Sequence, residues 1–160
     1  MVARGPDEHH RVSTPLELFF DLCFAVAVAA AAGELRHAEG APGHLAPGLV
    51  SYLVVFFAIW WAWMNVTLFA SAYDTDDVAW RLSVLVVVAG ALVLAAGVPR
   101  AFEDRDLLVV TLGYRIIRTS LVLLWLRAAR DDPPHRETAQ RTALGVTLCA
   151  LGWVASCPSP

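Results

Sequence analysis

The sequence predicts an all-α polytopic transmembrane helix bundle with four full spans and a partial fifth. Of its 160 residues, 58% are hydrophobic and 17% are charged, whereas a soluble domain is usually about 45–50% apolar and about 25% charged. The apolar residues are gathered in blocks, and a membrane-spanning helix needs about 20 of them, with a range of about 17–25. Four blocks reach this range and a fifth is short: 16–33, 49–72, 82–98, 107–126 and the partial 142–155.

The first apolar block begins with a helix start signal, after a polar tail at residues 1–13. Thr14, Pro15 and Glu17 match an N-cap threonine, a proline at the first helical position and a glutamate that completes a capping box. The structural interpretation is that Glu17 satisfies backbone N–H groups at the helix start. The alternative is that Glu17 belongs to a proton or cation site.

Short polar connections separate the later blocks, at residues 34–47, 73–79, 99–106 and 127–141. Such connections favour antiparallel neighbouring helices. The fifth block stops at a Ser-Cys-Pro-Ser-Pro sequence, so we expect the transmembrane domain, residues 14–160, to be truncated inside its fifth helix. The alternative is a four-helix protein with a tail that lies on the membrane surface.

Charge and cysteine usage limit the location and the partners. Arginine is more frequent in the tail and in the connections on its side than in those opposite, so the positive-inside rule predicts a cell-membrane protein with a cytoplasmic N-terminus. The net charge is −3 and no basic patch suggests nucleic acid. The three cysteines form no C-x-x-C pair, and we expect no metal site, cofactor or catalytic motif. Membrane lipid is the expected partner, and an ion, a small solute or a second copy of the chain are further candidates.

Charged residues inside the apolar blocks are the strongest functional signal. Asp21 lies one turn deeper than Glu17 on the same helix face, and a charge inside a span costs roughly 2.5–3.5 kcal/mol on insertion scales. Arg115 and Arg118 interrupt the fourth block. Counted along their helices, Asp21, Asn65 and Arg118 lie roughly 8–12 Å from the same end of the bundle. We therefore expect a buried polar cluster of these three residues, with Glu17 and Arg115 at its margins.

This cluster supports two functional hypotheses. In the first, it moves an ion or small solute, with Asp21 as the titrating or cation-facing group, Arg118 as its counter-charge and Asn65 fixing the geometry. In the second, the protein is a non-transporting scaffold or stress-adaptation protein, and the cluster only orients the helices, as buried ion pairs often do.

A third hypothesis is an intramembrane lipid-modifying enzyme. The acids of the second connection, Asp74, Asp76 and Asp77, would then hold a divalent metal near a lipid headgroup, but the glycine and glutamate of a calcium loop are absent from this stretch. A solvated loop is the simpler interpretation. The neighbouring Trp60, Trp61 and Trp63 are interpreted as helix packing, with a ligand platform as the alternative.

Several stretches together resemble a known family. TPLELFFDLCFAVAV, FFAIWWAWMNVTLFASAYDTDDVAWRL, AGALVLAAGVPRAF and LGYRIIRTSLVLLWLRAAR are similar to the bacterial low temperature requirement protein A (LtrA) family, over residues from about Thr14 to Arg130. The resemblance implies a polytopic membrane protein, usually longer than this chain, linked to growth in the cold. It assigns no catalytic residue, although it places six polar residues on motif positions: Glu17, Asp21, Asn65, Asp74, Asp76 and Asp77. Cys23 departs from the branched aliphatic residue expected there.

Overall fold

The computed structural model describes residues 2–3, 14–39, 45–74, 76–104 and 106–156. Six helices make up almost all of this part of the chain. They are α1 (Pro15–Glu39), α2 (Leu45–Ala72), α3 (Val78–Ala96), α4 (Val98–Glu103), α5 (Leu108–Asp131) and α6 (Arg136–Ser156). The remaining elements are the two-residue strands β1 (Val2–Ala3) and β2 (Tyr73–Asp74), which pair antiparallel, and a turn of 3₁₀ helix, η1 (Pro133–His135).

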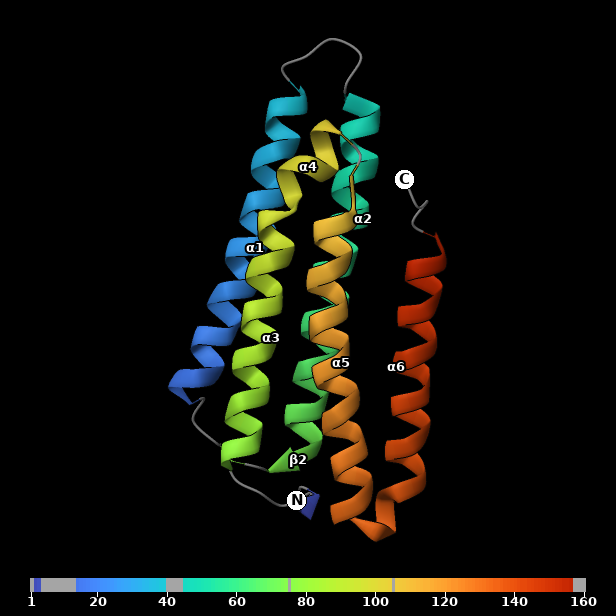
Figure 1. Ribbon diagram of the computed structural model, residues 1–160. Coiled ribbons are helices and arrows are strands. Elements are labelled where there is room, and N and C mark those ends of the chain that lie inside the picture. Colours follow the sequence, from blue (N-terminus) through green and yellow to red (C-terminus); the bar gives the residue numbers. More distant parts are fainter. Residues whose placement is uncertain (1, 4–13, 40–44, 75, 105, 157–160) are drawn as a thin grey trace.

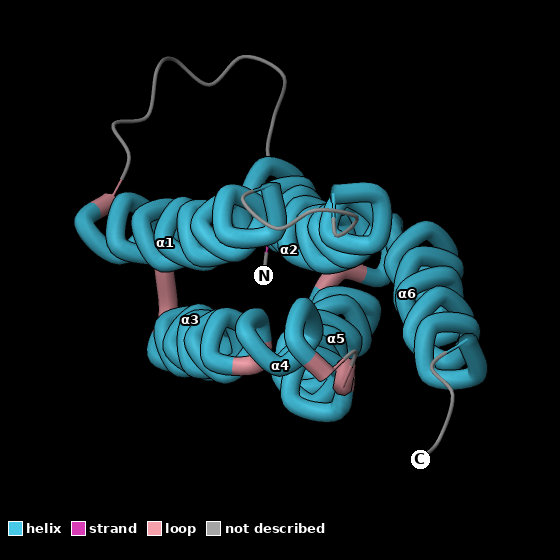
Figure 2. The backbone as a smooth tube through the Cα atoms, turned by 90° about the horizontal axis from the view of Figure 1, so that it is seen from above, coloured by secondary structure: helices cyan, strands magenta, loops and turns pink. Residues whose placement is uncertain are grey.

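The five long helices lie side by side, and each runs antiparallel to the next along the chain (Figure 1). Seen from above, α1 and α2 form one side of the bundle, α3 and α5 form the other, and α6 lies outside them beside α5 (Figure 2). Four helices are long and apolar enough to cross a membrane: Pro15–His37, Leu45–Ala72, Val78–Ala96 and Leu108–Asp131. The predicted helical bundle with four full spans is therefore confirmed.

The outward faces of these four helices are also apolar. Leu22 on α1, Leu53 on α2, Leu82 on α3 and Leu123 on α5 are all more than half exposed. A soluble bundle would place charged or polar residues at such positions. Leucine on both the inner and the outer faces is expected where the surrounding solvent is lipid, so the protein is a multi-pass membrane protein with its outer surface in the bilayer.

On one side of the bundle, α3 and α5 make the closest helix contact. Gly113 on α5 lies so near α3 that an added Cβ would come within 2.5 Å of the backbone nitrogen of Leu94. A Cβ at Gly90 on α3 would come within 2.8 Å of the Ile117 side chain. Small residues allow such close backbone approach, which is how helices associate in a membrane without a hydrophobic driving force between them. This contact fixes the position of α5, which carries Arg118.

Two segments differ in extent from the expected elements. The block predicted as a partial span at 142–155 is the second half of a longer helix, because α6 already begins at Arg136, among charged residues that were assigned to a connection. The connection at 99–106 contains the short helix α4, with Pro99 in its first turn. Proline is well suited to a helix start, because the N–H that it lacks has no partner within the helix there.

The start of α1 has the predicted capping box. The backbone nitrogen of Thr14 donates to Oε2 of Glu17 at 2.8 Å, and the backbone nitrogen of Glu17 donates to Oγ1 of Thr14 at 3.2 Å. This is the reciprocal pair of hydrogen bonds expected from the structural interpretation of Glu17. The second connection, β2 and the α5–α6 turn lie at this same end of the bundle (Figure 1). The cytoplasmic location of this end stays a prediction.

Candidate functional site

Arg118 occupies the interior of the bundle, near the middle of α5. Its side chain is only 2% exposed. Nη2 donates to the hydroxyl of Tyr114 at 2.5 Å, and the guanidinium carbon lies 4.7 Å from the Tyr114 ring centroid and 6.0 Å from that of Trp61 on α2. Nε and Nη1 of Arg118 are buried without a hydrogen-bond partner among the described residues. A buried guanidinium therefore has two nitrogens whose hydrogen-bonding capacity is unused.

A cavity of about 250 Å³ lies beside this guanidinium, between α2, α5 and α6. Arg118 lines it from α5, and the residues from the other two helices are Trp61, Asn65, Thr142, Gly145, Val146 and Cys149. The α6 residues follow a spacing of three and four, so they share one face of that helix. The cavity is largely apolar, and Arg118 supplies its positive charge.

Asn65 lies on the same face of α2 as Trp61, one turn away. Its Nδ2 donates to the backbone carbonyl of Trp61 at 2.6 Å. This bond holds the amide in place and leaves its carbonyl oxygen without a partner among the described residues. The structure thus brings together Asn65 and Arg118, as predicted, at one cavity.

Asp21 lies elsewhere, in a separate groove between α1 and α2. Its Oδ1 accepts a hydrogen bond from Nε1 of Trp63 at 2.7 Å, and the side chain is exposed on the outer surface of the bundle. No described arginine forms an ion pair with it. The predicted pairing of Asp21 with Arg118 is therefore wrong.

The reason for this error is the angular position of the residues around α2. Trp61, beside Arg118, and Trp63, bonded to Asp21, are two residues apart along α2. They are thus about 3 Å apart in height but about 200° apart around the helix. Asp21 and Arg118 lie at a similar level, as the depth argument required, but on opposite sides of α2. Depth along a helix does not determine which neighbour a side chain faces.

The two residues expected at the margins of the cluster also lie outside the cavity. Glu17 caps α1, as described above. Arg115 is exposed, although it is only three residues from the buried Arg118. The close packing of α5 against α3 and α2 buries the Arg118 face and leaves Arg115 on the edge of that face. Arg115 thus lies outside the cavity, and its expected place at the margin of the cluster stays a prediction.

Two of the three acids of the second connection are engaged by basic side chains. Asp76 is bonded to Arg81 through both carboxylate oxygens, at 3.0 and 2.9 Å. Asp77 forms an ion pair with Arg127 from α5. Asp74 lies in β2, opposite Val2 of β1. No group of three or more histidine, cysteine, aspartate or glutamate side chains suited to a metal ion occurs within the described ranges.

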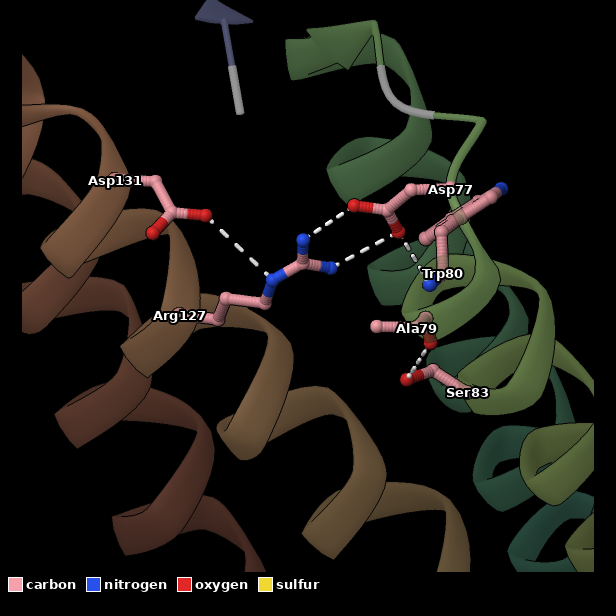
Figure 3. A network of polar contacts seen from close by, with 6 residues as sticks. All are labelled: Asp77, Ala79, Trp80, Ser83, Arg127 and Asp131. Carbon is pink, nitrogen blue, oxygen red and sulfur yellow. Dashed lines mark hydrogen bonds and ion pairs between the residues drawn. The ribbon is translucent and has the colours of Figure 1, made fainter.

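Asp77 joins two helices at the end of the bundle (Figure 3). Its Oδ1 accepts from the backbone nitrogen of Trp80 at 2.8 Å, which caps α3, and also from Nη1 of Arg127 at 3.0 Å. Nε of Arg127 lies 3.5 Å from Asp131. The hydrogen bond from Arg127, together with the helix cap and the nearby positive charge, lowers the pKa of Asp77 to about 2. Asp77 thus has a structural role, because it caps α3 and pairs with Arg127 of α5.

Sequence reasoning missed two residues of these contacts. Tyr114 precedes Arg118 by four residues, and this helical spacing is a signal that could have identified it as the hydrogen-bonding partner. Arg127 was assigned to a connection, but α5 continues to Asp131 and carries Arg127 to Asp77. Trp61, interpreted as helix packing, lies against the Arg118 guanidinium and lines its cavity.

Comparison with known proteins adds a family but no chemistry. Residues 12–160 match the family described as Bacterial low temperature requirement A protein (LtrA). The chain is 29% identical over 140 residues to "Uncharacterized protein RA0937" of Rhizobium meliloti (strain 1021), in an alignment covering 86% of this chain and 32% of the relative. The chain thus spans about a third of the length of this relative. No solved structure matches it significantly. Because the family match covers nearly the whole chain, the protein belongs to the bacterial low temperature requirement A family.

Proposed function

We propose that the protein binds an anion, either an inorganic ion or a small organic solute, in the cavity beside Arg118 and moves it across the membrane. The observation that carries this proposal is the burial of Arg118, which is 2% exposed and has two guanidinium nitrogens without partners among the described residues. Arginine remains protonated at any physiological pH. A permanent positive charge beside a cavity therefore attracts an anion.

Burying the Arg118 charge without an anionic partner is energetically unfavourable. Taking an ion out of water costs several kcal/mol, even after a protein relaxes around it. The Tyr114 hydrogen bond and the ring contacts offset part of this cost, since a cation over an aromatic ring contributes about 0.5–2 kcal/mol. An anion in the cavity would supply the hydrogen-bond acceptors that Nε and Nη1 lack. Intramembrane ionisable groups that face a cavity are functional candidates for this reason.

The cavity lining favours a small organic anion over a hydrated inorganic one. Trp61 offers an aromatic surface, and Val146 and Gly145 offer apolar contact. The carbonyl oxygen of Asn65 is available to accept a hydrogen bond from a ligand donor. Arg118 lies near the middle of α5, roughly 15 Å from its first residue. Solute sites of membrane transporters commonly lie near the bilayer midplane.

The specific observation that favours the scaffold alternative is the contact of Arg118 with a neighbouring helix. Arg118 lies over Trp61 of α2 and is bonded to Tyr114 of α5. In a scaffold or stress-adaptation protein, the contact between Arg118 and Trp61 would hold α2 against α5 and the cavity would hold only lipid. The lipid-modifying alternative has weaker support, since Asp76 and Asp77 are engaged by arginines.

The test of the proposal is uptake of solutes into liposomes that contain the purified chain, with the longer Rhizobium relative reconstituted beside it. Chloride, acetate, benzoate and phosphate form the anion panel, and potassium is the cation control. Arg118→Met removes the charge, and Arg118→Lys keeps it. Arg115→Met is the matched control, because it removes an exposed arginine from the same helix.

We expect uptake of at least one anion and no uptake of potassium. Loss of a single charged hydrogen bond, at about 1.5–3 kcal/mol, predicts a decrease of about tenfold to a hundredfold in apparent affinity for Arg118→Met. The apparent affinity of Arg118→Lys should lie between those of the parent chain and Arg118→Met, and that of Arg115→Met should match the parent chain. Equal anion uptake by the parent chain and Arg118→Met would contradict the proposal.

A further inference from the structure

A second cavity on the opposite side of α2 has the reverse chemistry. It is a groove of about 270 Å³ between α1 and α2, and it is separate from the Arg118 cavity. Seven of its eight lining residues are apolar or aromatic, and the eighth is Asp21. The lining residues are Asp21, Phe24, Ala25, Val28, Phe56, Ile59, Trp60 and Trp63.

The groove runs along the helix axes, with its carboxylate at one end. Asp21 is opposite Trp63, to which it is hydrogen-bonded at 2.7 Å. Seven residues further along α1 is Val28, and seven residues back along α2 is Phe56, so the antiparallel pair keeps its register over roughly 10 Å. Asp21 is about 9 Å from the first residue of α1, nearer the membrane surface than the rest of the groove. The groove is therefore polar toward the headgroups and apolar toward the bilayer centre.

The residues that the structure describes only partly compensate the negative charge of Asp21. Trp63 donates one hydrogen bond to Oδ1, and no described cation pairs with the carboxylate. Trp60 is 39% exposed beside it, and Trp63 lies at the same end of the groove. A carboxylate next to tryptophan rings is the arrangement that recognises ammonium groups, through charge and through cation–π attraction.

We infer that this groove binds an amphiphile with an ammonium head and a single alkyl chain, the head at Asp21 and the chain along the groove toward Val28. This inference is independent of the proposed anion site, because the two cavities share no lining residue. A zwitterionic phospholipid fits less well, because its phosphate would lie close to the Asp21 carboxylate and no described basic residue lines the groove to receive it.

Native mass spectrometry of the full chain, released from dodecyl maltoside micelles, tests the inference directly. The probe is dodecyltrimethylammonium, and dodecyl sulfate, with the same chain and the opposite charge, is its control. Asp21→Asn keeps the side-chain shape and an acceptor for Trp63 but removes the charge. Glu34→Gln is the matched control, since it removes a carboxylate from the same helix outside the groove. Ala25→Trp fills the groove and leaves Asp21 in place, which keeps the test valid if Asp21→Asn misfolds.

We expect the parent chain and Glu34→Gln to bind dodecyltrimethylammonium about tenfold more tightly than they bind dodecyl sulfate. Both Asp21→Asn and Ala25→Trp should lose about tenfold in affinity for the ammonium probe. Unchanged affinity in either of these two variants would overturn the inference. Stronger displacement of the probe by phosphatidylethanolamine than by dodecylamine would also overturn the inference. A probe that changes the dimer population without binding to the chain would overturn it as well.

Discussion

Replacing Arg118 by methionine should leave the protein folded, with a melting temperature that is unchanged or higher. The change removes the charged hydrogen bond to Tyr114, at about 1.5–3 kcal/mol, and the ring contacts, at about 0.5–2 kcal/mol. It also removes the cost of burying a guanidinium with two unpartnered nitrogens, which is several kcal/mol. Apolar replacements of similar volume at buried ion pairs are often neutral or stabilising, by about 1–4 kcal/mol.

The assay is thermal unfolding of the detergent-solubilised chain, followed by far-ultraviolet circular dichroism. For a domain of this size, 1 kcal/mol corresponds to roughly 2–4 °C, so a stabilisation of zero to about 4 kcal/mol raises the melting temperature of Arg118→Met by between zero and about 16 °C. Arg115→Met controls for loss of an exposed arginine from α5. If Arg118→Met melts 5 °C or more below this control, Arg118 is a structural connection between α2 and α5 and not a ligand site.

Two further perturbations test the helix contacts that position this site. Asp77→Asn should destabilise the chain by at most about 1 kcal/mol near neutral pH, because its pair with Arg127 is partly exposed. The folded pKa of Asp77 is about 2, below the usual 3.8. The stabilisation by the pair is therefore fully present above pH 3.8 and is lost as the pH falls toward 2. If the stability of the parent chain relative to Asp77→Asn did not change over this range, the stabilising role of the pair would be contradicted. Gly113→Ala should destabilise the chain by about 1–3 kcal/mol through overpacking against α3. Gly33→Ala should not destabilise it, because an added Cβ there meets nothing within 4 Å. Similar melting temperatures for the two variants would show that the α3–α5 contact is not close.

The sequence was sufficient for features that depend on local chemistry. The capping box of Thr14 and Glu17 depends only on residue types at fixed spacing, and the structure has both of its hydrogen bonds. The four spans follow from the length and composition of the apolar blocks. These signals do not require knowledge of which helices become neighbours.

The candidate site was only half predictable because it depends on helix rotation and packing. The depth argument placed Asn65 and Arg118 together correctly, but it could not show that Asp21 faces the other side of α2. Most spans are apolar around nearly their whole circumference, so the hydrophobic pattern does not indicate which face is inside. In α5, the glycine contact with α3 selects the buried face, and sequence spacing alone gave no way to separate Arg118 from Arg115.

The reactivity of Cys149 gives the most direct measurement of anion binding, because this exposed thiol lines the Arg118 cavity, whereas Cys23 is buried. In a Cys157→Ser background, the rate of Cys149 alkylation by N-ethylmaleimide is measured with benzoate or with its neutral counterpart benzamide. Benzoate should slow alkylation at least tenfold, benzamide should not, and Arg118→Met should abolish the protection. Equal alkylation rates with and without benzoate, or protection that persists in Arg118→Met, would contradict anion binding beside Arg118.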